Sequence, residues 1–229
     1  MTFYAIYQDI LQELNISADT YERISEQEIV DAINEAQKEV ARLGLRGIHK
    51  DLILAYLSKE SKILDISNPT EDTVTLPSDF LEYLGAWRDY TVTADTQARN
   101  NQVSFSLITE PEARTLYSNP YHRPTVYNPY IVLFRSDDNP SCKIYPPIQS
   151  TLTKDDVYLY YLKKPAEWSG TSDTTSTPEL PELLLEALKY YACYLIIKRA
   201  ESGFEEKAQE YYNLALEKAG IPVNEVKRA

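Results

Sequence analysis

Apolar side chains recur every three or four residues near the start of the chain, and this spacing predicts two helices. The first stripe covers residues 3–14. The second covers residues 29–43 and follows residues 25–28 (SEQE), which match a capping box at a helix N-terminus. Gly44 comes directly after this stripe, and glycine there is typical of a helix end. We therefore expect two amphipathic N-terminal helices, followed by an ambiguous stretch at 45–58.

The period changes in the middle of the chain, where short runs of strand-forming residues are separated by turn residues. Ser78 is placed to begin a helix of one or two turns, and residues 110–117 form a second short helical pattern. Three prolines within residues 119–129 predict a loop. The expected strands are residues 62–66, 72–76, 87–93, 102–107, 130–135, 142–145 and 157–162.

Helical spacing returns near the end of the chain. One stripe covers residues 180–196, and another covers 204–219 and ends at Gly220, before Pro222. A polar segment at 170–177 separates these stripes from the strand region. The sequence thus predicts two C-terminal helices after a linker.

These patterns predict an α+β fold, because four amphipathic helices are most simply satisfied by packing on one another. The N- and C-terminal helix pairs would form a four-helix bundle, with an antiparallel β domain inserted between them. The expected parts are a bundle of residues 1–58 and 178–220, a β domain of residues 59–169, a linker at 170–177 and a C-terminal tail at 221–229.

The formal charge of −12 argues against a general nucleic-acid-binding surface, because such binding depends on Lys and Arg at phosphates. No run approaches 18 apolar residues, so no membrane span is predicted, and the N-terminus lacks the basic region of a secretory signal. The chain has 19 Tyr against 5 Phe. Tyrosine enrichment is typical of subunit interfaces, although biased codon usage would give the same composition.

Catalytic motifs are absent from the sequence. His49 and His122 have no nucleophile beside them, and the six glycines are too scattered for a phosphate-binding loop. The two cysteines are expected to be free thiols. Residues 137–139 and 155–156 contain oxygen ligands suited to Ca²⁺ or Mg²⁺, but turns rich in Asp have the same composition. We expect no catalytic residue, no metal and no cofactor.

The strand at 157–162 carries apolar side chains on both faces and is expected to be buried on both, in a sandwich or against another subunit. Together with the Pro- and Tyr-rich loop, it supplies the candidate residues for a subunit interface. These candidates are Tyr121, His122, Arg123, Tyr127, Tyr130, Tyr158 and Tyr160.

Residues 180–192 and 207–216 resemble the closing helix pair of head–tail adaptor proteins from tailed bacteriophages, of which tail tubular protein A and related neck ring proteins are the nearest match. Residues 76–81 and 160–165, and the order of the elements, are also similar to that family. The resemblance implies a non-enzymatic virion protein of the neck, assembled in the host cytoplasm. It would form a ring, typically of twelve copies, that docks on the portal, contacts further neck or tail rings and lets DNA pass without specific binding.

The tail is the candidate portal contact, through Pro222, Val223, Val226, Lys227 and Arg228. The alternative function is a protein that binds carbohydrate or another ligand, or an enzyme, with its pocket in the β domain. Trp87, Trp168 and the loop from Tyr121 to Tyr130 would then serve as stacking platforms.

Overall fold

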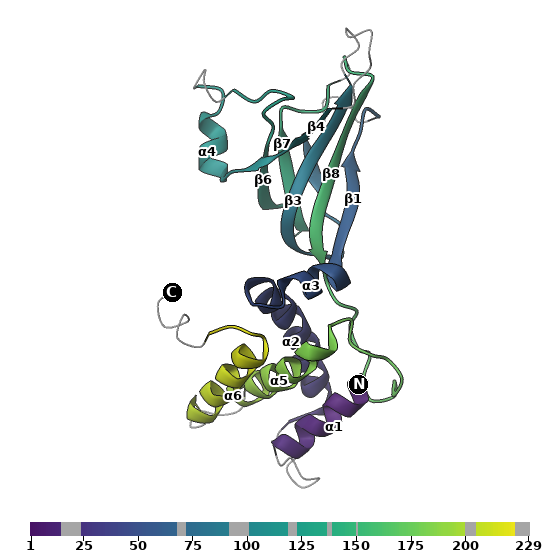
Figure 1. Cartoon of the computed structure of the whole chain (residues 1–229), viewed down its shortest axis with the longest axis vertical. Coiled ribbons are helices and arrows are strands. Elements are labelled where there is room, and N and C mark those ends of the chain that lie inside the picture. Colours follow the sequence, from purple (N-terminus) through teal and green to yellow (C-terminus); the bar gives the residue numbers. More distant parts are fainter. Residues whose placement is uncertain are drawn as a thin grey trace. The chain divides into compact units, whose positions relative to one another are not determined.

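The chain is an α+β protein, as the hydrophobic pattern predicts (Figure 1). The computed structural model describes residues 1–14, 24–67, 72–91, 101–118, 123–136, 139–149, 151–199 and 205–222. Two compact units are present: a helical unit of Met1–Ser58 with Lys164–Ala229, and a β unit of Lys59–Lys163.

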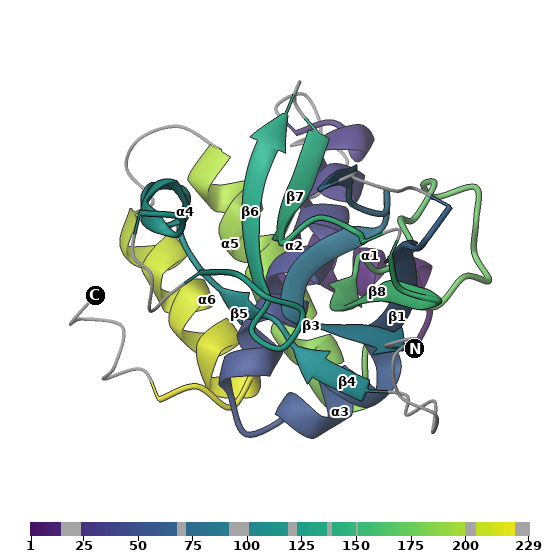
Figure 2. The same cartoon turned by 90° about the horizontal axis from the view of Figure 1, so that it is seen from above.

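The helical unit gathers its helices around α5, which contacts α1, α2 and α6. Figure 2 shows α5 and α6 running side by side. The regular four-helix bundle expected from the sequence stays a prediction. The helices are α1 (Phe3–Glu13), α2 (Glu26–Arg46), α3 (Lys50–Leu57), the 3-10 helix η2 (Glu182–Leu184), α5 (Leu185–Arg199) and α6 (Glu205–Lys218).

The N-terminus of α2 has the predicted capping box. Ser25 Oγ accepts a hydrogen bond from the Glu28 amide at 3.3 Å, and Glu28 Oε2 accepts one from the Ser25 amide at 2.7 Å. The expected helix end at Gly44 is wrong, because α2 continues past this residue. Gly44 is needed for packing instead: a Cβ there would lie 2.6 Å from Ile53 Cγ1 and 3.2 Å from Leu184 Cδ1. The missing side chain lets α3 and η2 approach α2.

The predicted end of α6 at Gly220 is confirmed. Gly220 has φ +74°, its amide donates to the Glu217 carbonyl at 3.0 Å, and the Ile221 amide donates to the Leu216 carbonyl at 2.9 Å. This pair of bonds is the Schellman arrangement, which needs a left-handed residue. The chain is thereby turned back toward the segment before α3.

The segment that leads into η2 is held against α1 and α2. The Trp168 ring stacks on Phe3, with centroids 5.8 Å apart, and its Nε1 donates to the Asp173 carbonyl at 2.9 Å. Asn34 of α2 bonds both backbone groups of Trp168, and the Phe3 amide donates to the Ser176 carbonyl. The expected division into domains, with a linker at 170–177, stays a prediction. The contacts of Trp168 and Ser176 show only that the segment before η2 packs on α1 and α2.

The β unit consists of two four-stranded sheets. Some consecutive strands pair within one sheet, and others cross to the other sheet. The short β5–β6 pair is parallel, whereas the pairs β2–β7, β3–β4, β3–β8 and β6–β7 are antiparallel. The first sheet has the order β1 (Ser58–Leu64), β8 (Lys154–Lys163), β3 (Phe80–Thr91), β4 (Asn101–Ser104); the second has the order β2 (Thr73–Thr75), β7 (Asn139–Tyr145), β6 (Tyr130–Ser136), β5 (Ser106–Leu107).

Buried side chains from both sheets meet in one core, so the β unit is a sandwich. The outer face of β6 is covered by the short helix α4 (Glu110–Thr115), through Ala113 and Leu116 against Tyr130 and Val132. The core comprises Leu64, Leu76, Ala86, Phe105, Ile131, Cys142, Ile144, Ile148, Val157, Leu159 and Tyr161.

The helix expected after Ser78 is wrong. A single turn forms there, in which the Phe80 amide donates to the Pro77 carbonyl at 2.9 Å, and β3 begins at Phe80. Pairing with β8 starts at this same residue, opposite Lys163. Ladder bonds from β8 therefore replace those that a helix would have formed, and local sequence preference is overridden.

Strand β8 is buried on one face over most of its length, not on both. Val157, Leu159 and Tyr161 are fully buried in the core, whereas Tyr158 and Tyr160 are half-exposed; Leu162, near the end of the strand, is also fully buried. A sandwich has a single inner face, so the alternation of the strand sends the second set of side chains outward.

A charged pair is enclosed inside the sandwich. Arg88 Nε and Nη2 donate to the two carboxylate oxygens of Asp155, each at 2.6 Å, and neither side chain is exposed. Arg88 also donates to the carbonyls of Pro146 and Pro147, and the Gln149 amide donates to Asp155 at 2.7 Å. The network ties β3 and β8 to the loop after β7.

Candidate interaction surfaces

The outer face of the β3–β8 pair carries three half-exposed aromatic side chains. Trp87 pairs with Tyr158, and their rings stack with centroids 5.7 Å apart and planes 13° from parallel. Tyr160 pairs with Gly85, where a Cβ would meet no atom within 4 Å. We call Trp87, Tyr158 and Tyr160 the aromatic face. Trp and Tyr at half-buried positions are the residues most enriched in binding hot spots.

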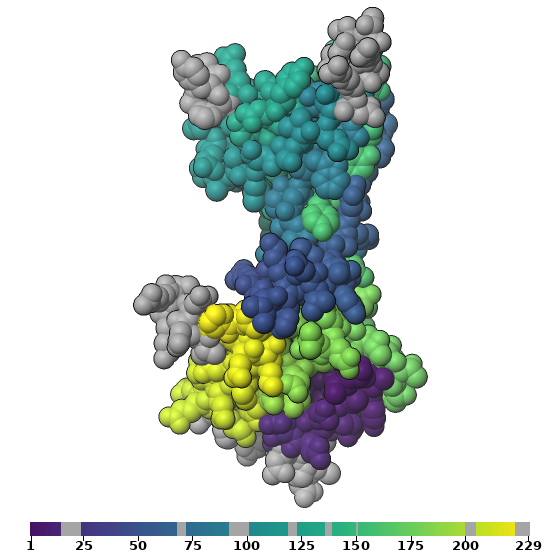
Figure 3. Space-filling view, in the orientation of Figure 1, coloured from purple at the N-terminus to yellow at the C-terminus, as the bar shows by residue number. Residues whose placement is uncertain are grey.

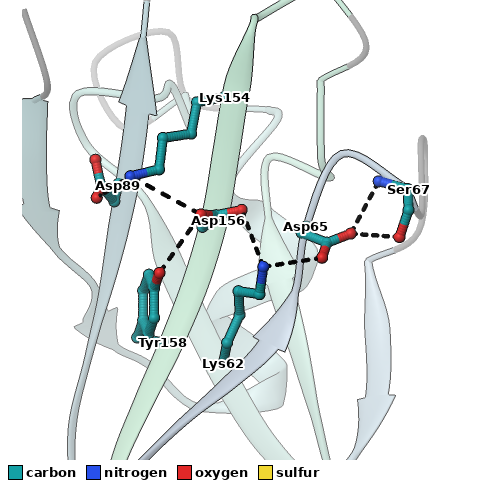
Figure 4. A network of polar contacts seen from close by, with 7 residues as sticks. All are labelled: Lys62, Asp65, Ser67, Asp89, Lys154, Asp156 and Tyr158. Atoms are coloured by element: carbon teal, nitrogen blue, oxygen red, sulfur yellow. Dashed lines mark hydrogen bonds and ion pairs between the residues drawn. The ribbon is translucent and has the colours of Figure 1, made fainter.

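A line of alternating charges continues this face across β3, β8 and the end of β1 (Figure 4). Lys154 Nζ lies 2.6 Å from Asp89 Oδ2 and 3.9 Å from Asp156 Oδ2, while Lys62 Nζ lies 3.8 Å from Asp156 Oδ1 and 3.1 Å from Asp65 Oδ2. These five residues are the charged ladder. The two lysines of the ladder are partly exposed, whereas the Asp89 and Asp156 side chains are only 10% and 13% exposed. The alternating signs suit the ladder to selecting a partner.

Hydrogen bonds favour the ionised forms of three ladder residues, Lys62, Asp65 and Lys154. The bond to Asp89 raises the pKa of Lys154, and the bond to Asp65 raises the pKa of Lys62. The Ser67 hydroxyl and amide donate to Asp65 and lower the pKa of its carboxyl to about 2. The charges of Lys62, Asp65 and Lys154 are therefore fixed through the physiological pH range.

The described part of the Pro- and Tyr-rich loop splits the predicted interface residues into two groups. Arg123 and Tyr127 are exposed, Tyr127 by 66%, and the Tyr127 ring meets buried Tyr90 edge to face at 5.7 Å. Tyr130 is buried beneath α4, and its hydroxyl accepts a hydrogen bond from Asn128 Nδ2 at 2.7 Å. Of these three predicted interface residues, only Arg123 and Tyr127 can contact another molecule without a change in the packing of the β unit.

Pro222 is exposed and is the last described residue. The remaining predicted contacts, Tyr121, His122, Val223, Val226, Lys227 and Arg228, lie outside the described residues.

The groups considered for metal or acid–base chemistry are separated from one another. Asp155 is paired with Arg88 and Asp156 with the two ladder lysines, and His49 stands at the start of α3. Within the described ranges, no three His, Cys, Asp or Glu side chains are grouped so as to hold a metal ion. Residues 137 and 138 lie outside those ranges.

Trp168 is not available as a stacking platform for a sugar, because it is 2% exposed and its ring is covered by Phe3. Of the two tryptophans in the alternative function, only Trp87 has an accessible face.

Sequence reasoning found Tyr158 and Tyr160 but missed the stack with Trp87 and the charged ladder, since both depend on the register between β3 and β8. The sequence does contain a signal for both features. It is the order Trp87, Asp89, Thr91 on one strand and Lys154, Asp156, Tyr158 on the other. An antiparallel pairing of these two runs brings them into line.

Aromatic side chains bordered by ion pairs, on a sheet face that no described helix of the unit covers, are typical of a surface that docks with other proteins. The comparison with known families shows which family the chain belongs to. A family model described as SU10 adaptor protein matches residues 1–227, and the chain belongs to this family of bacteriophage adaptor proteins. It is a structural component of the virion that interacts with other phage structural proteins.

No curated protein matches the chain. Among the described helices, none has the length and apolar character needed to cross a bilayer.

Proposed function

We propose that this adaptor is a non-enzymatic neck ring of the tail tubular protein A type. Copies of the chain, typically twelve, close into a ring that docks on the portal and extends the DNA channel toward further neck or tail rings. Membership of the adaptor family over residues 1–227 is the observation that carries this proposal. The ring is assembled in the host cytoplasm and remains in the neck of the virion.

The charge of the subunit supports a channel role. Each copy carries a formal charge of −12, so a ring of copies repels the phosphates of the duplex that passes through it. Repulsion without specific contacts keeps DNA from binding to the wall during packaging and ejection.

A closed ring needs two different patches on each copy, because its contacts are head-to-tail. We assign one of them to Arg123 and Tyr127, whose ring packs on Tyr90 at the inner side of β3, with their sequence neighbours Tyr121 and His122. The other is the aromatic face on the outer side of β3 and β8. The charged ladder beside this face provides the alternating signs that reject a misaligned neighbour. The helical unit, arranged as a four-helix bundle, provides the remaining rigid body of the subunit.

Ring formation is tested by mixing the chain with the purified portal of the same virus and counting bound subunits by light scattering and electron microscopy. Tyr127→Ala and Tyr160→Ala should each weaken ring closure by roughly 30-fold, the effect of losing about 2 kcal/mol at an interface. Tyr117→Ala is the matched control, since Tyr117 is 55% exposed and lies outside the proposed patch. Equal effects of all three variants would remove the interface assignment.

The portal contact is assigned to the tail through Pro222, Val223, Val226, Lys227 and Arg228. Ile221 closes the Schellman arrangement of α6, so a truncation that removes only residues 223–229 preserves the helix end. This variant should fold normally and fail to attach to the portal in a pull-down or by electron microscopy. Attachment at the wild-type level would refute the assignment.

A further inference from the structure

The row of side chains on the outer face of β3 and β8 has a gap at Gly85. Trp87 follows Gly85 on the same face of β3, and Tyr160 stands opposite Gly85 on β8. A Cβ at Gly85 would meet no atom within 4 Å, so bare backbone lies between two aromatic side chains. We call this position the Gly85 gap. Figure 3 shows part of β8 (green) exposed at the surface of the β unit. The gap suits a flat apolar group, because aromatic rings pack well on rings of the same kind.

The charged ladder beside the gap has an excess of negative charge. Its three carboxylates outnumber its two lysines. The ladder residue nearest to the gap on β3 is Asp89, whose Oδ1 is buried without a hydrogen-bond partner among the described residues. Gly85 and Asp89 are four residues apart on one strand, which is about 13 Å. A partner that covers both should therefore carry a flat apolar group and, about this far from it, a cation.

The loop before β6 carries such a pair of groups. Tyr127 is 66% exposed, and Arg123 is exposed and forms no ion pair with the residues that the structure describes. The two residues are four positions apart, so their Cα atoms are separated by at most about 14 Å. The guanidinium of Arg123 stays charged at every physiological pH. The loop and the sheet face of one chain therefore match in sign, in the type of side chain and in spacing.

We propose that this loop docks on the first sheet of the next copy of the chain, with the Tyr127 ring in the Gly85 gap and the Arg123 guanidinium against the carboxylates of the charged ladder. The inference rests on the proposed function, because it describes the contact between neighbours in a ring. A head-to-tail contact needs two different patches that complement each other, and complementary charge fixes how they align.

Filling the gap tests where Tyr127 docks. Gly85→Leu places its side chain in open space, so the variant should unfold thermally like the wild type. It occupies the proposed site of Tyr127, so closure of rings on purified portal should weaken at least about tenfold, as counted by light scattering and electron microscopy. The double variant Gly85→Leu/Tyr127→Ala should be weakened less than the two single effects together, because residues in contact are not additive.

Reversing a charge tests the second contact. Arg123→Glu brings a carboxylate to the acidic ladder and should weaken ring closure at least about tenfold, less so as salt is added. Arg135→Glu is the matched control, since Arg135 is an exposed arginine of the same unit outside the proposed contact. It should close rings within twofold of the wild type. Equal effects of the two variants would overturn the role of Arg123.

A photo-cross-link reads the contact directly in the assembled ring. Tyr160 is replaced by photoreactive p-benzoylphenylalanine, and isotope-labelled and unlabelled copies are mixed so that cross-links between copies are recognised by mass spectrometry. These cross-links should fall on residues 123–128, whereas the same group in place of Tyr117 should not reach them.

The outcomes separate this inference from the proposed function. Rings that form normally with Gly85→Leu, or cross-links from position 160 that fall elsewhere in the neighbour or on the portal, overturn the docking of Tyr127 and leave the ring intact. Failure of the wild-type chain to form rings on the portal overturns both.

Discussion

Arg88 and Asp155 illustrate how a single buried pair can fix a sheet. Both side chains are unexposed, and the Arg88 side chain donates its hydrogen bonds to Asp155 and to carbonyls of the loop after β7. Removing two charges from water is costly, and here a two-point ion pair with three further hydrogen bonds offsets that cost. The pair gives β3 and β8 one register and holds the loop in place.

Removing one partner of this pair should destabilise the chain strongly. We expect Arg88→Met to lower the free energy of unfolding by about 3 to 5 kcal/mol, because it leaves a buried carboxylate without its counter-ion. The double variant Arg88→Met/Asp155→Leu should recover part of the loss. Urea titration followed by circular dichroism measures both. Lys62→Met, which breaks exposed pairs of the charged ladder, is the control and should change stability little; a loss equal to that of Arg88→Met would contradict this account.

The two cysteines should be unreactive while the chain is folded. Burial raises the pKa of Cys142 and of Cys193 to about 12, so both remain thiols at pH 8, and the thiolate is the reactive form. Iodoacetamide at pH 8 should label neither residue in the native chain and both in urea, as read by mass spectrometry. Rapid labelling of native protein would refute this.

The same shift gives a pH dependence. An unfolded thiol has a pKa near 8.5, so above that pH the unfolded chain loses protons that the folded chain retains. The contribution of the two thiols is complete below about pH 8.5 and is lost as the pH rises toward about 12.

The effect on stability of replacing a glycine within a helix or strand depends on what surrounds that glycine. In an exposed helix, replacing glycine by alanine stabilises by about 1 kcal/mol. At Gly44 the added methyl would instead overlap Ile53, so we expect Gly44→Ala to destabilise the chain by about 1 to 3 kcal/mol. Gly85→Ala is the control, because a Cβ there meets nothing within 4 Å, and it should be neutral or slightly stabilising. Thermal unfolding distinguishes the two, and equal effects would show that Gly44 is not a packing position.

The elements predictable from sequence are those whose pattern is local. The apolar stripes and the capping box at Ser25 locate α1, α2, α5 and α6, and Gly220 marks the end of α6, because these signals involve residues within one or two turns. The region after Ser78 was misread as helix, since its strand is fixed by pairing with β8 more than 80 residues away. Gly44 was misread for the same reason: its constraint comes from another helix.

The candidate surfaces were predictable only in part. Tyr158 and Tyr160 stand out in the sequence as aromatic positions of one strand, but their neighbour Trp87 and the charged ladder require the strand register. Residues 45–58 stayed ambiguous because this segment contains apolar residues on two sides, and no pattern within it tells which side is buried.

At the scale of the whole molecule, the formal charge of −12 leads to a prediction about DNA. The free chain should show no binding to a 30-base-pair duplex in fluorescence anisotropy, at low salt as well as at physiological salt, because it has no excess of cations to displace counterions from phosphates. A histone-like basic protein serves as the positive control. Binding that strengthens as salt is lowered would contradict the proposed passive channel wall.

The β unit enters the chain through β1 and leaves it through β8, and these strands are neighbours in one sheet. Both junctions, at Ser58–Lys59 and Lys163–Lys164, therefore belong to adjacent strands. An inserted module with adjacent ends can be exchanged by recombination for another of similar spacing, without altering the helices that flank it.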